Sequence, residues 1–524
     1  MNTAASTRGL RRPDRRQPRG AGTDAQGFDD RRADPGDAEA LAGQGPPPTL
    51  DQTLDHALAR IGSDTGAALI ADGLEAFAVR AASARKATRT LDLQYYAWHD
   101  GITGRLLAAE LLAAADRGVR VRLLLDDSTV LDEHSALPLL CSLGAHPCIE
   151  VRLFNAHRWR FLGRLGFMLE MVASRGQLNH RMHNKSWIAD NRLAILGGRN
   201  IGDEYFDASG DFNFRDLDVA VAGVAAAQAV RQFERYWNHR LSLRGVGCAG
   251  YGTAEELETL RPQLSSVADS EEARPYIERL ENSRIQDVLD GESGLLPTQD
   301  IEVDVAADPP DKASGEEVRG KLVNAVGAAL LGARHEALLI SPYFVPGEAG
   351  TRVLIDLLRR GVRITVVTNS LAATDVVAVH GGYARYRRRL LKAGIDLYEL
   401  RRSGDENAGV LGSKGASLHT KAFSLDRQRI FVGSFNLDPR SANLNTEMGA
   451  FIHHAGLAER LQEEFHRLAS PARSYHVRLR HGIMSWTDLR PDGRPRLRHK
   501  EPDASFGRRL LAQLVRWLPV ESQL

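Results

Sequence analysis

The sequence predicts an α/β protein made of two similar domains, each a mainly parallel sheet flanked by helices, related by a pseudo-two-fold axis. The first observation is a pattern, His-x-Lys-x4-Asp-x6-Gly-x2-Asn, that occurs twice in the 524 residues. Each member of the second copy lies 236 residues after its counterpart. The second observation is a similar succession of apolar and amphipathic segments before each copy. Equal spacing in both copies indicates a duplicated structural unit.

The first half contains alternating strand and helix signals. Residues 90–98 are predicted to form a strand, 104–118 an amphipathic helix and 119–127 a buried strand. Residues 137–155 continue with a second helix and a third strand. Strands that alternate with short helices in this way favour a parallel sheet.

The second half repeats this order. Residues 336–345, 350–361 and 362–370 are predicted to form a strand, a helix and a strand. Residues 386–400 add a helix and a strand. Both halves therefore reach the repeated pattern after a β-α-β-α-β succession.

Changes of composition along the chain set the expected domain boundaries. The first 48 residues are rich in Arg, Asp, Gly and Pro and poor in large apolar residues, so we expect them to be disordered. The other expected divisions are a first domain (49–250), a connecting segment (251–310), a second domain (311–475) and a C-terminal extension with an amphipathic helix (476–524).

The overall composition restricts the class of protein. Hydrophobic residues make up 43% of the chain and charged residues 26%, as in soluble globular proteins. The net charge of +1 provides no global attraction to nucleic acid, so we expect no nucleic-acid partner. The three cysteines match no metal-ligand spacing and are expected to be reduced.

Each copy of the pattern places two basic side chains on one face of a strand. The copies are predicted to form a strand, a tight turn and a returning strand. Residues two apart in a strand project to the same side, so His183 lies beside Lys185 and His419 beside Lys421. Imidazole and ammonium groups in this arrangement suit the transfer of a phosphoryl group.

The other shared positions have predicted roles in the turn and in phosphate binding. Asp190 and Asp426 belong to the candidate catalytic set, although their place at the turn favours a structural role over direct chemistry. Small residues and amides after the returning strand are predicted to bind phosphate oxygens near a helix start. These candidate phosphate-binding residues are Gly198, Ser434, Asn200 and Asn436.

Two facing half-sites would divide the chemistry between the histidines. One imidazole attacks phosphorus while the other protonates the leaving oxygen, and the lysines and amides stabilise the charge on the remaining oxygens. Because these groups supply the positive charge, we expect neither a metal ion nor a cofactor. An imidazole nucleophile also needs a carboxylate to orient it. Asp216, Asp218 and Glu447 follow the motifs, and alignment of the two halves pairs Asp218 with Glu447.

These residues resemble the phospholipase D superfamily, whose signature is the duplicated His-Lys-Asp motif. The resemblance covers nearly all of residues 60–524, and residues 178–206, 368–400 and 418–449 look most like bacterial cardiolipin synthases of the C-type, which lack N-terminal transmembrane helices. It implies phosphatidyl transfer through a phosphatidyl-histidine intermediate. The implied acceptor is phosphatidylglycerol, and the implied donor is phosphatidylethanolamine or phosphatidylglycerol.

The resemblance also implies roles for the two histidines. His183 would be the nucleophile and His419 the general acid and then the general base, and the two-fold similarity leaves the exchanged assignment open. Water as the acceptor would give a phospholipase that releases phosphatidic acid, or a nuclease. A non-catalytic membrane-binding protein is a further alternative, which the two intact motifs disfavour.

Two amphipathic segments are candidates for contact with a membrane surface. Residues 158–174 and 508–524 combine apolar side chains with arginine and tryptophan, although such segments also pack on the body of a protein. We expect neither a signal peptide nor a spanning helix, because no apolar run follows the N-terminal arginines and no apolar run is long enough to span a bilayer. With phospholipids as substrates, we therefore expect a peripheral protein on the cytoplasmic side of the inner membrane. Nothing in the sequence identifies a protein partner. Asp375 and His380 are weaker candidates for the substrate pocket.

Overall fold

The structure is a computed structural model that describes residues 47–127, 134–157, 159, 170, 177–245, 252–282, 295–297, 303–316, 318–402, 415–489 and 494–517. The segment 1–46, which is nearly all of the region expected to be disordered, lies outside the described residues. The amphipathic segment 158–174 also lies outside them, apart from Trp159 and Glu170.

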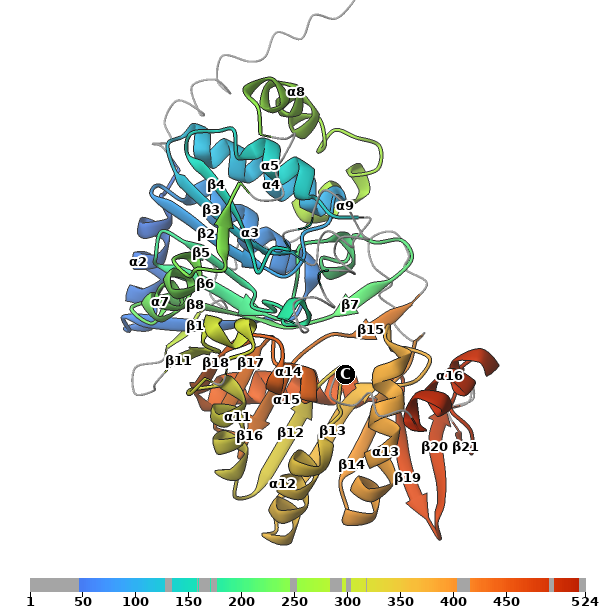
Figure 1. Ribbon diagram of the computed structural model, residues 1–524. Coiled ribbons are helices and arrows are strands. Elements are labelled where there is room, and N and C mark those ends of the chain that lie inside the picture. The colour runs from blue at the N-terminus through green and yellow to red at the C-terminus, as the bar shows by residue number, and fades with distance from the viewer. Residues whose placement is uncertain are drawn as a thin grey trace, which may run out of the picture. The chain divides into compact units, whose positions relative to one another are not determined.

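The first half of the chain forms a 9-stranded sheet with the order β10-β1-β8-β6-β5-β2-β3-β4-β9 (Figure 1). Its strands are β1 (Thr65–Ile70), β2 (Thr90–Tyr95), β3 (Arg120–Asp126), β4 (Ile149–Phe154), β5 (Ser186–Ala189), β6 (Leu193–Gly197), β8 (Asp218–Gly223), β9 (Ser242–Arg244) and β10 (Leu296–Pro297). The helices of this half are α2 (Leu50–Ile61), α3 (Gly73–Lys86), α4 (Ile102–Asp116), α5 (Leu137–Leu143) and α7 (Ala226–Trp237), followed by α8 (Ala254–Ser265) and α9 (Arg274–Asn282).

The second half forms a 10-stranded sheet with the order β11-β18-β17-β16-β12-β13-β14-β19-β20-β21. Its strands are β11 (Val303–Ala307), β12 (Glu336–Ile340), β13 (Arg363–Asn369), β14 (Asp396–Leu400), β16 (Ala422–Leu425), β17 (Arg429–Gly433), β18 (Met448–His453), β19 (Ser474–Arg480), β20 (Ile483–Leu489) and β21 (Pro495–Arg498). Its helices are α11 (Leu322–Leu331), α12 (Gly347–Arg359), α13 (Val377–Ala393), α14 (Pro439–Asn443), α15 (Ala455–Ala469) and α16 (Phe506–Trp517).

The predicted α/β class and the duplication are confirmed, but both sheets are mixed rather than mainly parallel. Parallel pairing joins β2, β3 and β4 in one sheet and β12, β13 and β14 in the other. These strands belong to the predicted β-α-β-α-β units, whose helical crossovers allow parallel neighbours. The repeated motifs form the hairpins β5–β6 and β16–β17, and a short turn makes the strands of a hairpin antiparallel.

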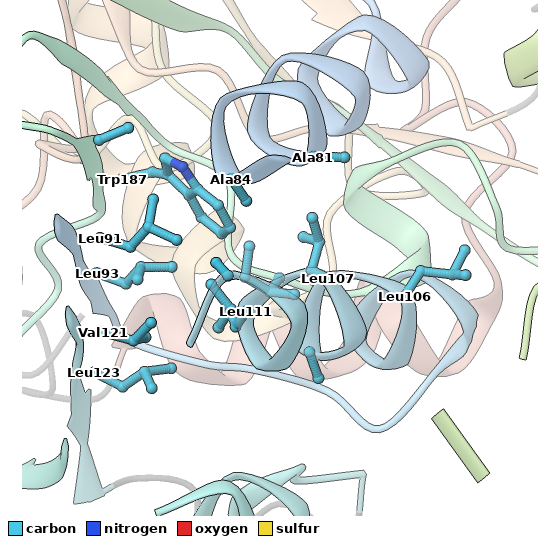
Figure 2. Packing of buried hydrophobic residues seen from close by; sticks show 14 of the residues in the cluster. Ala81, Ala84, Leu91, Leu93, Leu106, Leu107, Leu111, Val121, Leu123 and Trp187 are labelled. Carbon is cyan, nitrogen blue, oxygen red and sulfur yellow. The ribbon is translucent and has the colours of Figure 1, made fainter. Parts of the chain in front are cut away.

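Helices α3 and α4 cover one face of the first sheet (Figure 2). Leu91 and Leu93 alternate with polar residues along β2, so both point to this face. The small side chain of Ala84 lies beside the Trp187 ring of β5, which allows α3 to approach the sheet closely. Each fully buried leucine or valine contributes about 1.5–3 kcal/mol relative to an exposed one.

A second core lies between the two sheets and joins the halves. It contains apolar residues from the other face of the first sheet and from one face of the second, together with residues of α7 and α15. Helix α7 contacts β11 of the second sheet, and α15 contacts β1 of the first. Residues 48–524 therefore form one compact unit.

The C-terminal residues extend the second half. Strand β19 pairs with β14, β20 pairs with β19, and β21 pairs with β20, so these three strands complete the second sheet. Helix α16 packs on α13 through Ala512 and Val515, and Gly381 of α13 leaves room for it. A Cβ atom at Gly381 would lie 3.1 Å from Cβ of Val515, so a larger residue there would separate the helices.

Two further features bear on the expectations from sequence. Cys148 is a free thiol, but Cys141 is disulfide-bonded, which contradicts the expectation of three reduced cysteines. Among the helices that the structure describes, none has the length and hydrophobicity needed to cross a bilayer.

Candidate active site

The two motif histidines lie where the halves exchange backbone contacts. Strand β7 (Asn213–Arg215) of the first half pairs in parallel with β15 (Ala416–Leu418) of the second, which leads directly into His419. The N–H of His419 donates to the carbonyl of Arg215 at 2.7 Å, and the N–H of His183 donates to the carbonyl of Thr446 at 2.9 Å. Each histidine is therefore fixed by the opposite half.

Each histidine contacts a buried carboxylate that also comes from the opposite half. Nδ1 of His183 lies 2.9 Å from Oε2 of Glu447, and Nδ1 of His419 lies 2.5 Å from Oδ2 of Asp216. Because Nδ1 of each ring faces a carboxylate, Nε2 is the nitrogen that remains for a substrate. The two contacts are reciprocal, as expected for halves related by a pseudo-two-fold axis.

The structure corrects the sequence alignment that chose Asp218 as the partner of Glu447. Gly197 pairs with Asp218 across β6 and β8, whereas Gly433 pairs with Gly449 across β17 and β18. The residue two places before Asp218 is Asp216, and this residue corresponds to Glu447. The Asp218 carboxylate instead accepts a hydrogen bond from Arg80 at 2.9 Å and lies 3.4 Å from the Arg199 guanidinium.

A two-residue shift of this kind is difficult to detect from sequence. Residues two apart in a strand point to the same face, so both aspartates satisfy the same alternation. The alignment of the two halves is set by the backbone pairs that their glycines form: Gly197 lies opposite Asp218, and Gly433 lies opposite Gly449. The correct alignment of the two half-sequences appears only when the hairpin and the following strand of one half are superposed on those of the other.

Two serine hydroxyls donate to the Glu447 carboxylate, and the backbone N–H of Glu447 donates to a buried aspartate. Ser434 Oγ donates to Oε2 of Glu447 at 2.5 Å, and Ser441 Oγ donates to Oε1 at 2.9 Å. The N–H of Glu447 donates to Asp308, which also accepts from the Lys312 ammonium at 2.8 Å. Burial raises the pKa of Glu447 to about 7, although Lys185 and the Ser434 hydroxyl oppose that shift.

The Asp216 carboxylate has a different environment. Burial alone would raise its pKa, but the positive charges of His419, Lys421 and Arg199 together hold the pKa of Asp216 below its usual range. Gly198 leaves room for this carboxylate, because a Cβ atom there would lie 2.5 Å from Oδ1 of Asp216. The expected phosphate-binding residues Gly198 and Ser434 thus both adjoin an orienting carboxylate.

The two motif lysines are buried beside their histidines. Lys185 Nζ donates to the carbonyl of His183 at 2.7 Å, and Lys421 Nζ donates to the carbonyl of His419 at 2.5 Å. Burial lowers the pKa of Lys185 to about 7, and burial also lowers the pKa of Lys421. A bound anion would stabilise the ammonium form of both side chains.

Burial lowers the pKa of both histidines, but to different extents. The pKa of His183 falls well below its ordinary value, and the positive charges of Lys185 and Lys421 lower it further. The pKa of His419 is also lowered by burial and by Lys421, but the Asp216 carboxylate opposes this shift. The Asp216 carboxylate thus favours the protonated form of His419, whereas the lysines near His183 favour its neutral form.

The motif aspartates occupy the tight turns, at the end of each hairpin away from the histidines. The Asp190 carboxylate accepts hydrogen bonds from the N–H groups of Thr88, Arg89 and Thr90. The Asp426 carboxylate accepts from the corresponding N–H groups of Arg334, His335 and Glu336. Asp190 and Asp426 have φ values of 51° and 52°, a left-handed conformation that Asp tolerates. These contacts support the structural role.

The two motif asparagines differ in their contacts, and neither begins a long helix. Asn200 Nδ2 donates to the Tyr205 hydroxyl at 2.9 Å, and its Oδ1 accepts from the N–H of Ala97 at 3.3 Å. Asn436 is only 4% exposed, and its Oδ1 has no hydrogen-bond partner among the described residues. Because Nδ2 of Asn200 already donates to Tyr205, Nδ2 of Asn436 is the candidate amide donor to a substrate.

Aromatic side chains line both half-sites, and sequence reasoning missed them. The Tyr96 ring lies 5.2 Å from the His183 ring, and Lys185 Nζ lies 5.4 Å from the centre of Tyr96. Tyr205 and Phe214 lie 5.3 and 4.8 Å from the His419 ring. No spacing in the sequence marks these residues, because they come from separate segments: Tyr96 directly follows β2, Tyr205 ends a short 3-10 helix and Phe214 lies in β7.

Together these groups suit an in-line displacement at phosphorus. The charges of Lys421 and His419 act on His183, so the two half-sites belong to one electrostatic environment. One neutral imidazole can attack, while the other exchanges a proton with the leaving or entering oxygen. The buried ammonium groups are placed to stabilise the non-bridging oxygens. No group of His, Cys, Asp or Glu that could hold a metal ion occurs in the described part of the chain.

Comparison with known proteins identifies relatives that cover most of the chain. The family model described as "Cardiolipin synthase, PLD-like domain" matches residues 82–237 and 327–469. Cardiolipin synthase C of Escherichia coli (strain K12) is 41% identical over 456 residues, which cover 86% of this chain and 94% of the relative. An uncharacterized protein of Helicobacter pylori (strain ATCC 700392 / 26695) is 32% identical over 467 residues, which cover 87% and 89% of the two chains.

A solved structure shares the fold. The crystal structure of phosphatidylserine synthase from Haemophilus influenzae Rd KW20 aligns with a TM-score of 0.54 and 14% sequence identity. The alignment covers 81% of this chain and 92% of that chain. At this identity the likeness bears on the architecture alone.

Proposed function

Since the chain belongs to the family of cardiolipin synthases with phospholipase D-like domains, we propose that it transfers a phosphatidyl group between phospholipids and makes cardiolipin. Phosphatidylglycerol is the proposed acceptor, and phosphatidylethanolamine or phosphatidylglycerol the donor. The observation that carries the proposal is the reciprocal pairing of His183 with Glu447 and of His419 with Asp216. This arrangement provides one nucleophile and one proton carrier for a single phosphodiester.

The proposed reaction has two steps. In the first, Nε2 of His183 attacks phosphorus, the bond from phosphorus to the head-group oxygen breaks, and His419 gives its proton to that oxygen. In the second, the hydroxyl of the acceptor forms a bond to phosphorus and gives its proton to His419, while the bond from phosphorus to His183 breaks. The enzyme returns to its starting protonation state after both steps.

The electrostatic difference between the half-sites favours this assignment over the exchanged one. A nucleophile must be neutral, and the pKa of His183 is held well below its ordinary value by burial and nearby lysines. A general acid must hold a proton, and the Asp216 carboxylate favours the protonated form of His419. We therefore propose His183 as nucleophile and His419 as general acid and base.

The other motif residues have supporting roles in the proposal. Lys185, Lys421 and Asn436 hold the non-bridging phosphate oxygens, and the negative charge of the phosphate keeps the lysines protonated. Asp190 and Asp426 hold the hairpin turns to the preceding strands. Asn200 holds Tyr205 against the His419 half-site.

We propose that helix α16 contacts the membrane surface. Phe506, Leu510, Leu514 and Trp517 form an apolar stripe along the helix, and their exposed fractions are 79%, 49%, 56% and 79%. The opposite face, with Ala512 and Val515, packs on α13. An apolar stripe with a tryptophan, flanked by arginines, is typical of a helix at a bilayer interface. The proposed location is the cytoplasmic side of the inner membrane, with the protein bound peripherally.

The proposed function is tested by expression in a host that lacks cardiolipin, followed by mass spectrometry of the extracted lipids. We expect the wild type to restore cardiolipin. His183→Ala and His419→Ala should each reduce the product about 1,000-fold or more, because each removes a reacting group. An exposed substitution far from the site, Glu258→Gln on α8, is the matched control and should retain the product.

The alternatives have their own signatures in this experiment. A rise of phosphatidic acid without cardiolipin would identify a hydrolase and contradict the transferase. Cardiolipin formation that persists in both histidine variants would contradict the proposed site. Cleavage of added DNA with no change in lipids would point to a nuclease.

A further inference from the structure

Tyr343 and Asp375 form a polar pair in the second half that the two-step reaction does not use. The Tyr343 hydroxyl donates to Oδ2 of Asp375 at 2.6 Å. Tyr343 follows the end of β12, and Asp375 lies in the loop between β13 and α13. The carboxyl ends of neighbouring parallel strands meet at the same edge of a sheet, which is where ligands bind in α/β folds.

This pair lies on the side of the His419 half-site. Phe344, the residue after Tyr343, forms a bridge with Leu437, which directly follows the motif residue Asn436. Burial raises the pKa of Tyr343 well above its ordinary value, and the charges of Asp375 and Tyr205 raise it further. Tyr205 in turn contacts the His419 ring. The charge of Asp375 also acts on Lys421, where it opposes the lowering of the lysine pKa by burial.

The first half has no counterpart of Tyr343. Trp98 bridges Ile201 in the first half as Phe344 bridges Leu437 in the second, so Ala97 is the residue that corresponds to Tyr343. The N–H of Ala97 donates to Asn200, whereas Oδ1 of Asn436 has no partner among the described residues. The His419 half-site thus has Tyr343 where the other half-site has Ala97, and it has an Asn436 side chain whose Oδ1 has no partner among the described residues.

We propose that Tyr343 and Asp375 bind a second hydroxyl group of the acceptor alcohol, next to the hydroxyl that attacks phosphorus. The inference rests on the proposed transfer reaction. The attacking hydroxyl gives its proton to His419 as its oxygen bonds to phosphorus and the bond to His183 breaks. The neighbouring hydroxyl donates to Asp375 and accepts no proton, so the subsite takes no part in the bond changes. A glycerol head group has the required pair of adjacent hydroxyls.

The charges around Asp375 favour a neutral diol over an ammonium group. The Asp375 carboxylate favours the charged forms of both Lys421 and Arg508, so two cationic side chains already offset part of its charge. A third cation would be repelled by them. Hydroxyl donors satisfy the carboxylate and the phenol oxygen without adding charge.

The loop that carries Asp375 is also attached to the proposed membrane helix. Arg508 of α16 donates to the carbonyl of Leu371 at 3.0 Å and also to the carbonyl of Thr374. The pair therefore lies beside the part of the protein through which a lipid acceptor would arrive.

The test offers the full-length enzyme a phospholipid donor and an equal mixture of glycerol, 1-propanol and ethanolamine as soluble acceptors. The products of transfer to each alcohol are separated by mass spectrometry. For Asp375→Asn and Tyr343→Phe we expect the ratio of glycerol product to propanol product to fall about tenfold, the size of one hydrogen bond to a charged group. Asp356→Asn on α12 and Tyr398→Phe on β14 are matched controls, and both should keep the wild-type ratio.

Each other outcome would overturn the inference. An unchanged ratio in both variants would show that the pair does not bind the second hydroxyl. Equal losses of all three products would assign Asp375 a structural role at the start of α13. A preferential loss of the ethanolamine product would identify an ammonium site instead. Absence of any transfer product from the wild type would contradict the proposed function itself, and this result is distinguishable from the other three.

Discussion

At the residue scale, His183 and His419 have matching neighbours but different electrostatic surroundings. Each ring contacts a carboxylate through Nδ1 and adjoins a lysine that donates to the carbonyl of the same histidine. Glu447 is surrounded by serine hydroxyls and has a pKa raised by burial to about 7, whereas the pKa of Asp216 is held low by nearby cations. The change from Gly198 to Ser434 accompanies this difference, because the Ser434 hydroxyl donates to Glu447, so two similar half-sites differ in their electrostatic surroundings.

Asp216→Asn should shift the alkaline limb of the pH profile of kcat/KM to lower pH. The negative charge of Asp216 favours the protonated form of His419, so its removal lowers the pKa of His419. Because the proposed general acid must be protonated, activity is then lost at a lower pH, by about one pH unit or more.

The matching variant Glu447→Gln should leave this alkaline limb in place, since Glu447 contacts the other histidine. A shift of the acid limb in Asp216→Asn, with an unchanged alkaline limb, would mean that His419 is the nucleophile. That result would exchange the proposed roles of the two histidines.

At the element scale, the repeated hairpins and the last helix have the secondary structure that their periodic patterns predict. Both motif hairpins have the expected strands and turns, with Asp190 and Asp426 in left-handed conformations. The amphipathic character of α16 was also predicted, but Val515 packs on α13 instead of joining the exposed stripe. Periodicity shows which residues form an apolar face, but it does not show what covers that face. The contacts with Gly381 distinguish the residues of α16 that pack on α13 from those that are exposed.

The double substitution Leu510→Glu and Leu514→Glu should weaken binding to phospholipid vesicles at least about tenfold. Each exposed leucine that enters a bilayer interface contributes on the order of 1.5 kcal/mol or more, and the added carboxylates oppose insertion. Co-sedimentation with vesicles that contain phosphatidylglycerol measures this effect.

Leu331→Glu provides the matched control, because Leu331 lies on α11 with 48% of its surface exposed. This variant should bind vesicles as the wild type does. Equal vesicle binding by the wild type and the double variant would exclude α16 as the membrane contact.

At the scale of the whole molecule, the site exists only because the halves exchange contacts. Strand β7 pairs with β15, Thr446 pairs with Met182, and each histidine takes its carboxylate from the opposite half. The core between the sheets, with α7 and α15, holds the halves in this arrangement. Each half supplies one motif histidine and one orienting carboxylate, and each pair joins the two halves.

Mixing the His183→Ala and His419→Ala chains should therefore leave activity absent. Both histidines of one site come from a single chain, so neither mutant chain holds a complete set of reacting groups. The measurement is cardiolipin formation after co-expression of the two variants, with a wild-type chain beside His183→Ala as the positive control. Recovery of activity in the mixture would mean that two chains exchange halves.

Much of the fold followed from the sequence, because its signals are local. The β-α-β-α-β units depend on apolar alternation along strands and helices, and the structure has them at the predicted places. The number of antiparallel neighbours was underestimated, since hairpin pairing adds strands on the other side of each parallel group. Asp218 was chosen over Asp216 because both satisfy the same two-residue period.

The sequence by itself determined the duplicated motif, the two histidine–lysine pairs and the turn-forming aspartates, because each depends on spacing within a few residues. Only the tertiary structure decided which carboxylate faces which histidine, that Tyr205 and Phe214 lie against His419, and that Tyr343 meets Asp375. These partners are far apart in the chain, and their approach depends on how two sheets pack around a shared core. No periodic pattern encodes that packing, since it is set by the shapes of many buried side chains at once.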